Sequence, residues 1–106
     1  MIVMLEATYP GTKADEAATK FLERLKTDPQ PEYVKIIDLY AFGAGDGYRV
    51  LLFYEIEKGK EAEGTKYISG GMVAMLNAIE GYKVESHVVY NMAEAFEFLG
   101  MKAPAV

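Results

Sequence analysis

The chain contains a single histidine, His87, within the segment VESHVVYN at residues 84–91. An imidazole exchanges protons near neutral pH, and a carboxylate beside it can complete an acid–base pair. We expect Glu6 to be that carboxylate, because the predicted first and last strands that carry Glu6 and His87 are neighbours in the topology inferred below. Glu6 and His87 are therefore the candidate catalytic residues. The competing interpretation places both side chains in solvent or at the rim of an interface.

Composition narrows the chemistry further. The 106 residues include no cysteine, which excludes disulfides, thiolate zinc sites, iron–sulfur clusters and a cysteine nucleophile. One histidine cannot build a histidine-rich metal centre, so the sequence predicts no metal site and no resident cofactor. Haem binding stays open as an alternative, with His87 as the one available axial histidine.

Charge and hydropathy restrict the partners. The net charge is −5 and the eleven basic residues are scattered, whereas binding to nucleic acid depends on clustered Lys and Arg. The first residues, MIVMLEATYPG, have no positive start and reach Glu6 after five residues, so they indicate a strand and not a signal peptide. No apolar run is long enough for a membrane helix. We therefore expect a cytoplasmic protein with no nucleic acid or membrane partner.

Hydrophobic periodicity predicts alternating strands and helices. Strands are expected at residues 1–9, 33–42, 48–57 and 82–90, and long helices from a Thr12 cap to residue 27 and from 60 to 80. Asn91, with Glu94 three residues later, is expected to cap a short last helix that ends before Gly100. Residues 1–100 are thus predicted to form one domain, followed by a flexible tail at 101–106.

Two glycine-rich segments allow a functional interpretation. Residues 43–47 could cradle a phosphate, but they join two predicted strands, whereas a phosphate loop opens onto a helix. Gly70 and Gly71 could break the second helix at an anion site. Because Gly71 falls on the apolar stripe of that helix, we favour a continuous helix in which Gly71 lies close against the sheet.

The element order β-α-β-β-α-β with a terminal helix predicts an α+β, ferredoxin-like fold with a four-stranded antiparallel sheet. Alternation along the strands then separates two faces. The set expected under the helices is Val3, Leu5, Ala7, Ile37, Leu39, Val50, Leu52, Ile56, Val84 and Val88. The opposite set is Ile2, Met4, Glu6, Thr8, Ile36, Asp38, Tyr40, Arg49, Leu51, Phe53, Glu55, Glu85, His87 and Val89. If Gly43 pairs with Tyr48, then Ile36 faces Glu55 and Asp38 faces Phe53.

The second face carries too much apolar surface to be left exposed on a globular domain. The chain has only a short terminal helix to spare, so we expect a second copy to cover this face, sheet against sheet, in a homodimer.

The pattern of residues 1–100 resembles the dimeric α+β barrel superfamily, and in particular a group of short uncharacterised single-domain members. The resemblance lies in the start MIVMLEATYP, the first helix ending in FLERL, and the strand VESHVVYN running into MAEAFEFLG. It implies a ferredoxin-like fold and a dimer. The superfamily includes cofactor-free monooxygenases, isomerases, haem-handling proteins and members without known activity, so the resemblance implies no single reaction.

In such a barrel the mixed face lines an interior cavity, where a small and partly apolar ligand could bind. Our primary hypothesis is such a ligand-enclosing homodimer, and the alternative is a cofactor-independent monooxygenase or isomerase using Glu6 and His87. The expected ligand-binding residues are Asp38, Tyr40, Arg49, Phe53 and Glu55. Tyr54 and Tyr67 could join Tyr40 and Phe53 in an aromatic wall, although such residues more often belong to a core.

Overall fold

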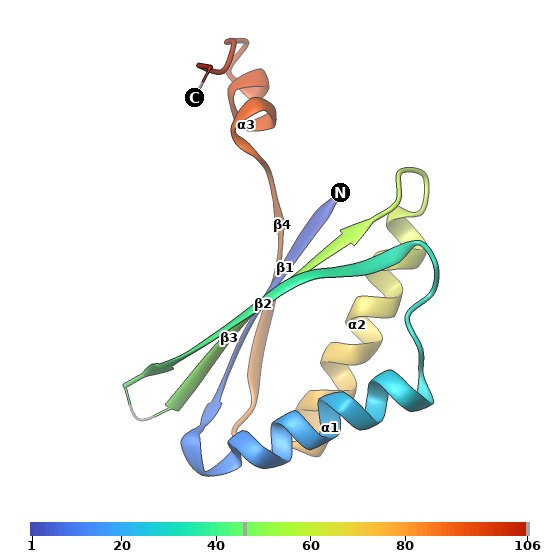
Figure 1. Ribbon diagram of the computed structural model, residues 1–106, viewed down its shortest axis with the longest axis vertical. Coiled ribbons are helices and arrows are strands. Elements are labelled where there is room, and N and C mark those ends of the chain that lie inside the picture. The colour runs from blue at the N-terminus through green and yellow to red at the C-terminus, as the bar shows by residue number, and fades with distance from the viewer. Residues whose placement is uncertain (46, 106) are drawn as a thin grey trace.

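A computed structural model describes residues 1–45 and 47–105 of the chain (Figure 1). The strands are β1 (Ile2–Pro10), β2 (Val34–Ala44), β3 (Gly47–Ile56) and β4 (Lys83–Val89). The helices are η1 (Gly11–Lys13), α1 (Ala14–Thr27), α2 (Glu61–Ala78) and α3 (Met92–Phe98). The element order is the predicted β-α-β-β-α-β with a terminal helix, and the long elements lie within a few residues of their expected bounds. The predicted Asp46 turn residue and Val106 lie outside the described residues.

The four strands form one antiparallel sheet in the order β2-β3-β1-β4. Both long helices cover the same face (Figure 1), which confirms the ferredoxin-like α+β fold. The buried core lies between the two layers and is formed by residues of β1, β2, β3 and α2. Its members are Val3, Leu5, Val34, Leu52, Tyr54, Ile56 and Ile68. The opposite face of the sheet, here called the open face, is covered by no other described element of the chain in Figure 1.

A bulge in β2 changes the predicted register. Gly43 pairs with Tyr48 and Asp38 with Phe53 as expected, but a register shift lies between Ile36 and Asp38, so Ile36 faces Tyr54 and not Glu55. The prediction for Ile36 and Ile37 is therefore wrong. Ile36 packs against the core, whereas Ile37 is left without a partner on β3 and is 51% exposed. A bulge inserts one extra residue and reverses the alternation beyond it.

The helices cover less of the sheet than the alternation suggests. Leu39 and Val88 belong to the set expected under the helices, yet they are 41% and 45% exposed. The β2–β3 hairpin extends past the helices at one end of the sheet, as Figure 1 shows. Apolar alternation therefore identified the face correctly but overestimated the covered area.

Glycines in α2 set the distance between the layers. The helix is continuous through Gly70 and Gly71, as we favoured, and the alternative of a break at an anion site is wrong for this described segment. A Cβ on Gly71 would lie 3.4 Å from Arg24 Nε of α1, so Gly71 faces the neighbouring helix and not the sheet as predicted. The close approach to the sheet occurs at Gly64, where a Cβ would lie 2.5 Å from Ile56 Cγ2.

The helix ends differ in how they are capped. The predicted Thr12 cap is wrong, because residues 11–13 form a 3₁₀ turn and the N-cap of α1 is Lys13, without a side-chain hydrogen bond. Asn91 does cap α3: its Oδ1 accepts from Glu94 N at 2.9 Å, and Glu94 Oε1 accepts from Asn91 N at 3.0 Å. Residues 101–105 contain no helix or strand. Among the described helices, none has the length and apolar character that a membrane crossing requires.

Candidate functional site

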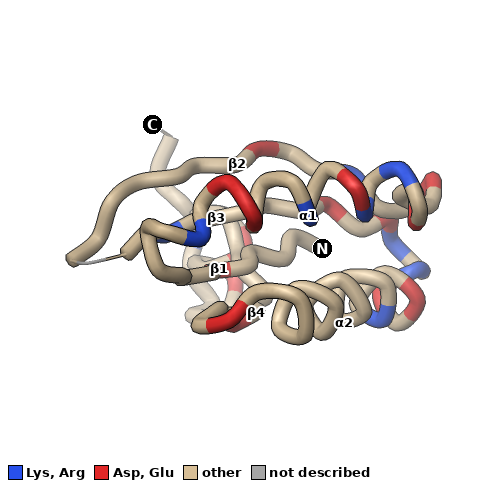
Figure 2. The backbone as a smooth tube through the Cα atoms, turned by 90° about the horizontal axis from the view of Figure 1, so that it is seen from below, with Lys and Arg blue, Asp and Glu red and all other residues tan. Residues whose placement is uncertain are grey.

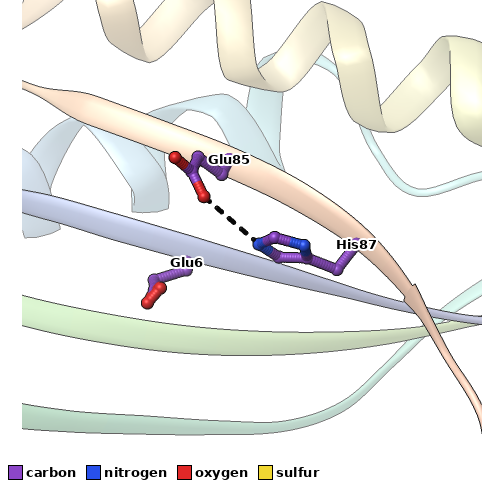
Figure 3. A group of neighbouring side chains, drawn as sticks. All are labelled: Glu6, Glu85 and His87. Atoms are coloured by element: carbon purple, nitrogen blue, oxygen red, sulfur yellow. Dashed lines mark ion pairs between the residues drawn. The ribbon is translucent and has the colours of Figure 1, made fainter.

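The predicted acid–base residues lie on adjacent strands of the open face (Figure 3). Met4 of β1 pairs with His87 of β4, and Glu6 pairs with Glu85. The nearest carboxylate to the imidazole is that of Glu85, whose Oε2 is 3.4 Å from His87 Nε2. Glu6 joins this group, because one ligating atom from each of the three side chains lies within 4.8 Å of the others.

The group combines two carboxylates with one imidazole, which is a donor set suited to proton transfer or to a cation. The side chains of His87 and Glu85 are 44% and 74% exposed, so neither is enclosed by the chain itself. Glu6 is half-buried and faces Glu85 directly across the strand pair, an arrangement in which two like charges repel. Sequence reasoning missed Glu85, although its spacing of two from His87 on a strand was the available signal.

The predicted ligand-binding residues divide into three places along β2 and β3. The carboxylate of Asp38 raises the pKa of the Tyr40 phenol, first through its capacity to accept a hydrogen bond and then through its negative charge. Tyr40 also packs edge-on against Phe53, with ring centroids 6.1 Å apart. These three residues therefore form one cluster. Arg49 and Glu55 lie apart from it and from each other, at opposite ends of β3.

The largest apolar pocket lies on the other face of the sheet, between α1 and the strands. Its volume is about 330 Å³, within the range of small-molecule sites. Ala17, Ala18 and Phe21 of α1 form one wall. The opposite wall and the ends consist of Leu5, Ala7, Tyr9, Leu22, Leu39, Ala41, Val50, Leu52, Met75 and Tyr82. Leu39 and Leu22 line the pocket and are also exposed to solvent.

Tyrosines supply the polar groups around this pocket. Tyr9 stacks between Tyr48 and Tyr82, with centroids 6.1 and 5.8 Å from its own. Burial, together with the neighbouring Tyr9, raises the pKa of Tyr82 to about 12, and burial is also the main reason that the pKa of Tyr9 is raised. Both phenols therefore stay protonated at neutral pH and can donate a hydrogen bond to a ligand at this end.

A smaller cavity of about 50 Å³ lies deeper between the two helices and the sheet. It is lined by Tyr54 and Tyr67 and shares Phe21, Met75 and Tyr82 with the larger pocket. Burial, with smaller effects of the neighbouring tyrosines, raises the pKa of Tyr54 to about 12. The hypothetical aromatic wall is thus split, because Tyr54 and Tyr67 lie on the helix side and Tyr40 and Phe53 on the open face.

Sequence reasoning did not identify the helix-side pocket. Five of its lining residues, Leu5, Ala7, Leu39, Val50 and Leu52, were assigned to the set under the helices, since alternation alone does not show where a helix stops covering a sheet. One signal was available: α1 presents the small residues Ala17 and Ala18 toward the sheet, where larger residues would have filled the space.

Comparisons with known proteins found likeness at the level of fold. No protein-family model matches the chain, and no curated protein matches it. A solved structure of a candidate antibiotic biosynthesis monooxygenase from Caulobacter crescentus CB15 is 20% identical, covering 85% of this chain and 91% of that one, with a TM-score of 0.43. A de novo designed protein, Foldit4, is 13% identical over 85% of this chain and all of its own, with a TM-score of 0.46. These resemblances are partial and assign no activity to this chain.

Proposed function

We propose that the protein is a homodimer of the dimeric α+β barrel type that binds a small, largely apolar molecule between α1 and the sheet. The observation that carries this proposal is the pocket of about 330 Å³ with an almost entirely apolar lining. A core of this size normally packs without voids larger than a water molecule, so an open apolar space of this volume needs an explanation. A bound ligand would explain this open space.

The lining defines the class of ligand. Apolar side chains on both walls favour a hydrocarbon or aromatic body, and the two alanines of α1 leave room for a flat ring. Tyr9 and Tyr82 line the pocket and carry phenols that stay protonated at neutral pH, so they are the candidate hydrogen-bond donors. A ligand with a ring system and one oxygen acceptor, such as an aromatic alcohol or ketone, satisfies both features.

The proposed dimer accounts for the exposed apolar surface of the open face. Ile2, Met4, Leu51 and Phe53 present apolar side chains there, and Tyr40 beside them is 55% exposed. Figure 1 shows helices on one side of the sheet and no third layer on its outer side among the described residues. A second sheet packed face to face would bury this surface.

Affinity measurements on paired variants test the ligand site. Ala18 and Thr19 are adjacent, exposed positions of α1, but only Ala18 lines the pocket. Ala18→Phe should fill the pocket and abolish binding of 2-naphthol measured by calorimetry, whereas Thr19→Phe should bind it like the wild type. Equal binding by the two variants, or no binding by the wild type to a panel of one- and two-ring aromatic alcohols, would refute the pocket assignment.

The group of Glu6, Glu85 and His87 supports a second candidate, proton transfer to or from a substrate on the open face. A ligand in the helix-side pocket lies across the sheet from His87, so this activity needs a substrate at the dimer interface. His87→Gln should then abolish turnover of a substrate with an acidic C–H or phenol group while leaving 2-naphthol affinity unchanged. Haem binding through His87 has no further observation in its favour and stays a prediction.

A further inference from the structure

Helix α3 is the most exposed apolar segment of the molecule. It continues from the end of β4 and projects away from α1 and α2 (Figure 1). Phe98 and Leu99 are 67% and 71% exposed, and Met92 and Met101 are also exposed. A seven-residue helix is not stable in water on its own, even with a capping box. Within the chain Phe98 packs edge-on against Tyr90, with ring centroids 4.7 Å apart, and packing on a further surface would stabilise the helix.

A positively charged surface lies at the end of the open face that is farthest from α3. Thr8 of β1 pairs with Arg49 on one side and with Lys83 on the other, so two cations flank one hydroxyl group. These residues line a polar recess of about 330 Å³ at the end of the sheet. Arg49 Nε is buried there, and no described residue accepts its hydrogen bond.

Apolar contacts are available beside the two cations. Phe42 of β2 pairs with Arg49 and is 44% exposed. The helix α3 carries the matching charges, because Glu94 and Glu97 lie one turn apart and both are exposed. Glu94 already serves the capping box, which leaves Glu97 as the carboxylate for a partner. Elsewhere acidic and basic residues are mixed, as along α1 in Figure 2.

The chain cannot make this contact with itself. β4 begins at Lys83 beside the recess and ends at Val89, and α3 follows beyond that opposite end. A two-fold axis that lies between two facing sheets and runs across their strands would turn one copy end over end. It would place α3 of each copy over the Arg49 end of the other. An axis along the strands would instead bring the acidic α3 helices of the two copies together, where like charges repel.

We infer that, in the homodimer proposed above, α3 is an exchanged arm that docks on the Arg49–Lys83 end of the partner's open face. Glu97 of one copy pairs with Arg49 of the other, and the apolar side chains around Phe98 cover Phe42. The inference rests on the proposed dimer and adds its direction and its specific contacts. It gives the partly exposed guanidinium of Arg49, whose Nε has no acceptor among the described residues, a carboxylate partner, and it gives α3 a surface to pack on.

Charge reversal in two separate chains tests this contact in trans. In the Glu97→Arg homodimer a second guanidinium faces that of Arg49. In the Arg49→Glu homodimer two carboxylates face each other. Each variant alone should dimerise about tenfold more weakly than the wild type by sedimentation velocity. The heterodimer that forms in a 1:1 mixture has two arm contacts. In one contact the two reversed side chains meet, and they carry opposite charges. In the other contact the native Glu97 and Arg49 meet, so both contacts are complementary. Native mass spectrometry should therefore find clearly more heterodimer than random pairing gives, which is twice the amount of either homodimer.

Controls separate this contact from a general effect of charge. Glu80→Arg and Lys66→Glu make the same charge changes at exposed sites off α3 and off the open face, and should leave the dimer unchanged. Lys83→Glu replaces Arg49→Glu if the latter does not fold. Variants that dimerise like the wild type, or a mixture whose heterodimer does not exceed the amount expected from random pairing, would overturn the arm contact and leave the dimer standing. A wild-type monomer at micromolar concentration would overturn both.

Discussion

Replacing Gly64 with alanine probes the closest contact between α2 and the sheet. The new Cβ would meet the side chain of Ile56 at 2.5, 2.8 and 2.9 Å, distances that real Cβ atoms do not tolerate. Ile56 is 1% exposed and belongs to the central core, so its side chain has no free space into which it can move. The substitution must therefore shift the helix away from β3 or push Ile56 out of its rotamer.

The expected loss of stability follows from two opposing effects. Inserting a methyl group into a packed core costs about 1–3 kcal/mol, whereas glycine to alanine in a helix interior gains up to about 1 kcal/mol. The overpacking effect is larger, so the free energy of unfolding should fall by about 1–2 kcal/mol. For a domain of this size that lowers Tm by roughly 5–15 °C.

Gly70→Ala is the matched control in the same helix. Gly70 is exposed, and its Cβ would approach only the end of the Arg24 side chain, at 3.5 Å. We expect a gain of about 0.5–1 kcal/mol, measured with its partner variant by urea unfolding followed by circular dichroism. If Gly64→Ala were as stable as Gly70→Ala, α2 would not lie against Ile56 as described, and the adjoining pocket walls would be misplaced as well.

Three further perturbations address charge and assembly. Burial raises the pKa of Tyr54 and Tyr82 to about 12, so the folded state resists their ionisation. Their contribution to the free energy of unfolding is full below pH 10 and should be lost between pH 10 and about 12. Alkaline unfolding of Tyr54→Phe should show a smaller loss over this range than the wild type. Glu6→Gln removes a like charge facing Glu85 and should stabilise by about 0.2–1 kcal/mol in low-salt thermal melts; a loss of stability would mean that the carboxylate has a favourable partner. Phe53→Asp puts a charge on the proposed dimer interface and should yield monomer or aggregate in light scattering, and an unchanged dimer would place the interface elsewhere.

The fold was predictable because local signals agreed with one another. β1 alternates strictly, with Val3, Leu5 and Ala7 buried between less buried neighbours, and Asn91 with Glu94 marks a helix start that the structure contains. The bulge at Ile37 was not predictable, because a run of apolar residues accepts an extra residue without any change in composition. Gly71 was predicted to lie against the sheet, but Gly64 fits the same helical stripe, and only the crossing of α2 over Ile56 distinguishes the two.

The candidate sites were predictable in part for similar reasons. Glu6 and His87 do lie on adjacent strands, as the topology required, but the position of Glu85 between them depended on the side chains of β4. The helix-side pocket depends on how far the β2–β3 hairpin extends beyond α1, which is a matter of tertiary geometry. In the sequence, Ala41 and Val50 resemble buried core residues. They form a wall of the helix-side pocket because the helices do not cover this part of the sheet.

The binding of a small apolar ligand in the helix-side pocket is tested most directly by NMR. Titrating 2-naphthol into the ¹⁵N-labelled protein should shift the backbone amide signals of Ala17, Ala41 and Val50, which line the pocket from α1, β2 and β3. The signals of Glu85 and His87, on the opposite face of the sheet, should stay in place. Shifts confined to the open face, or no saturable shift at Ala17, Ala41 and Val50, would contradict the account.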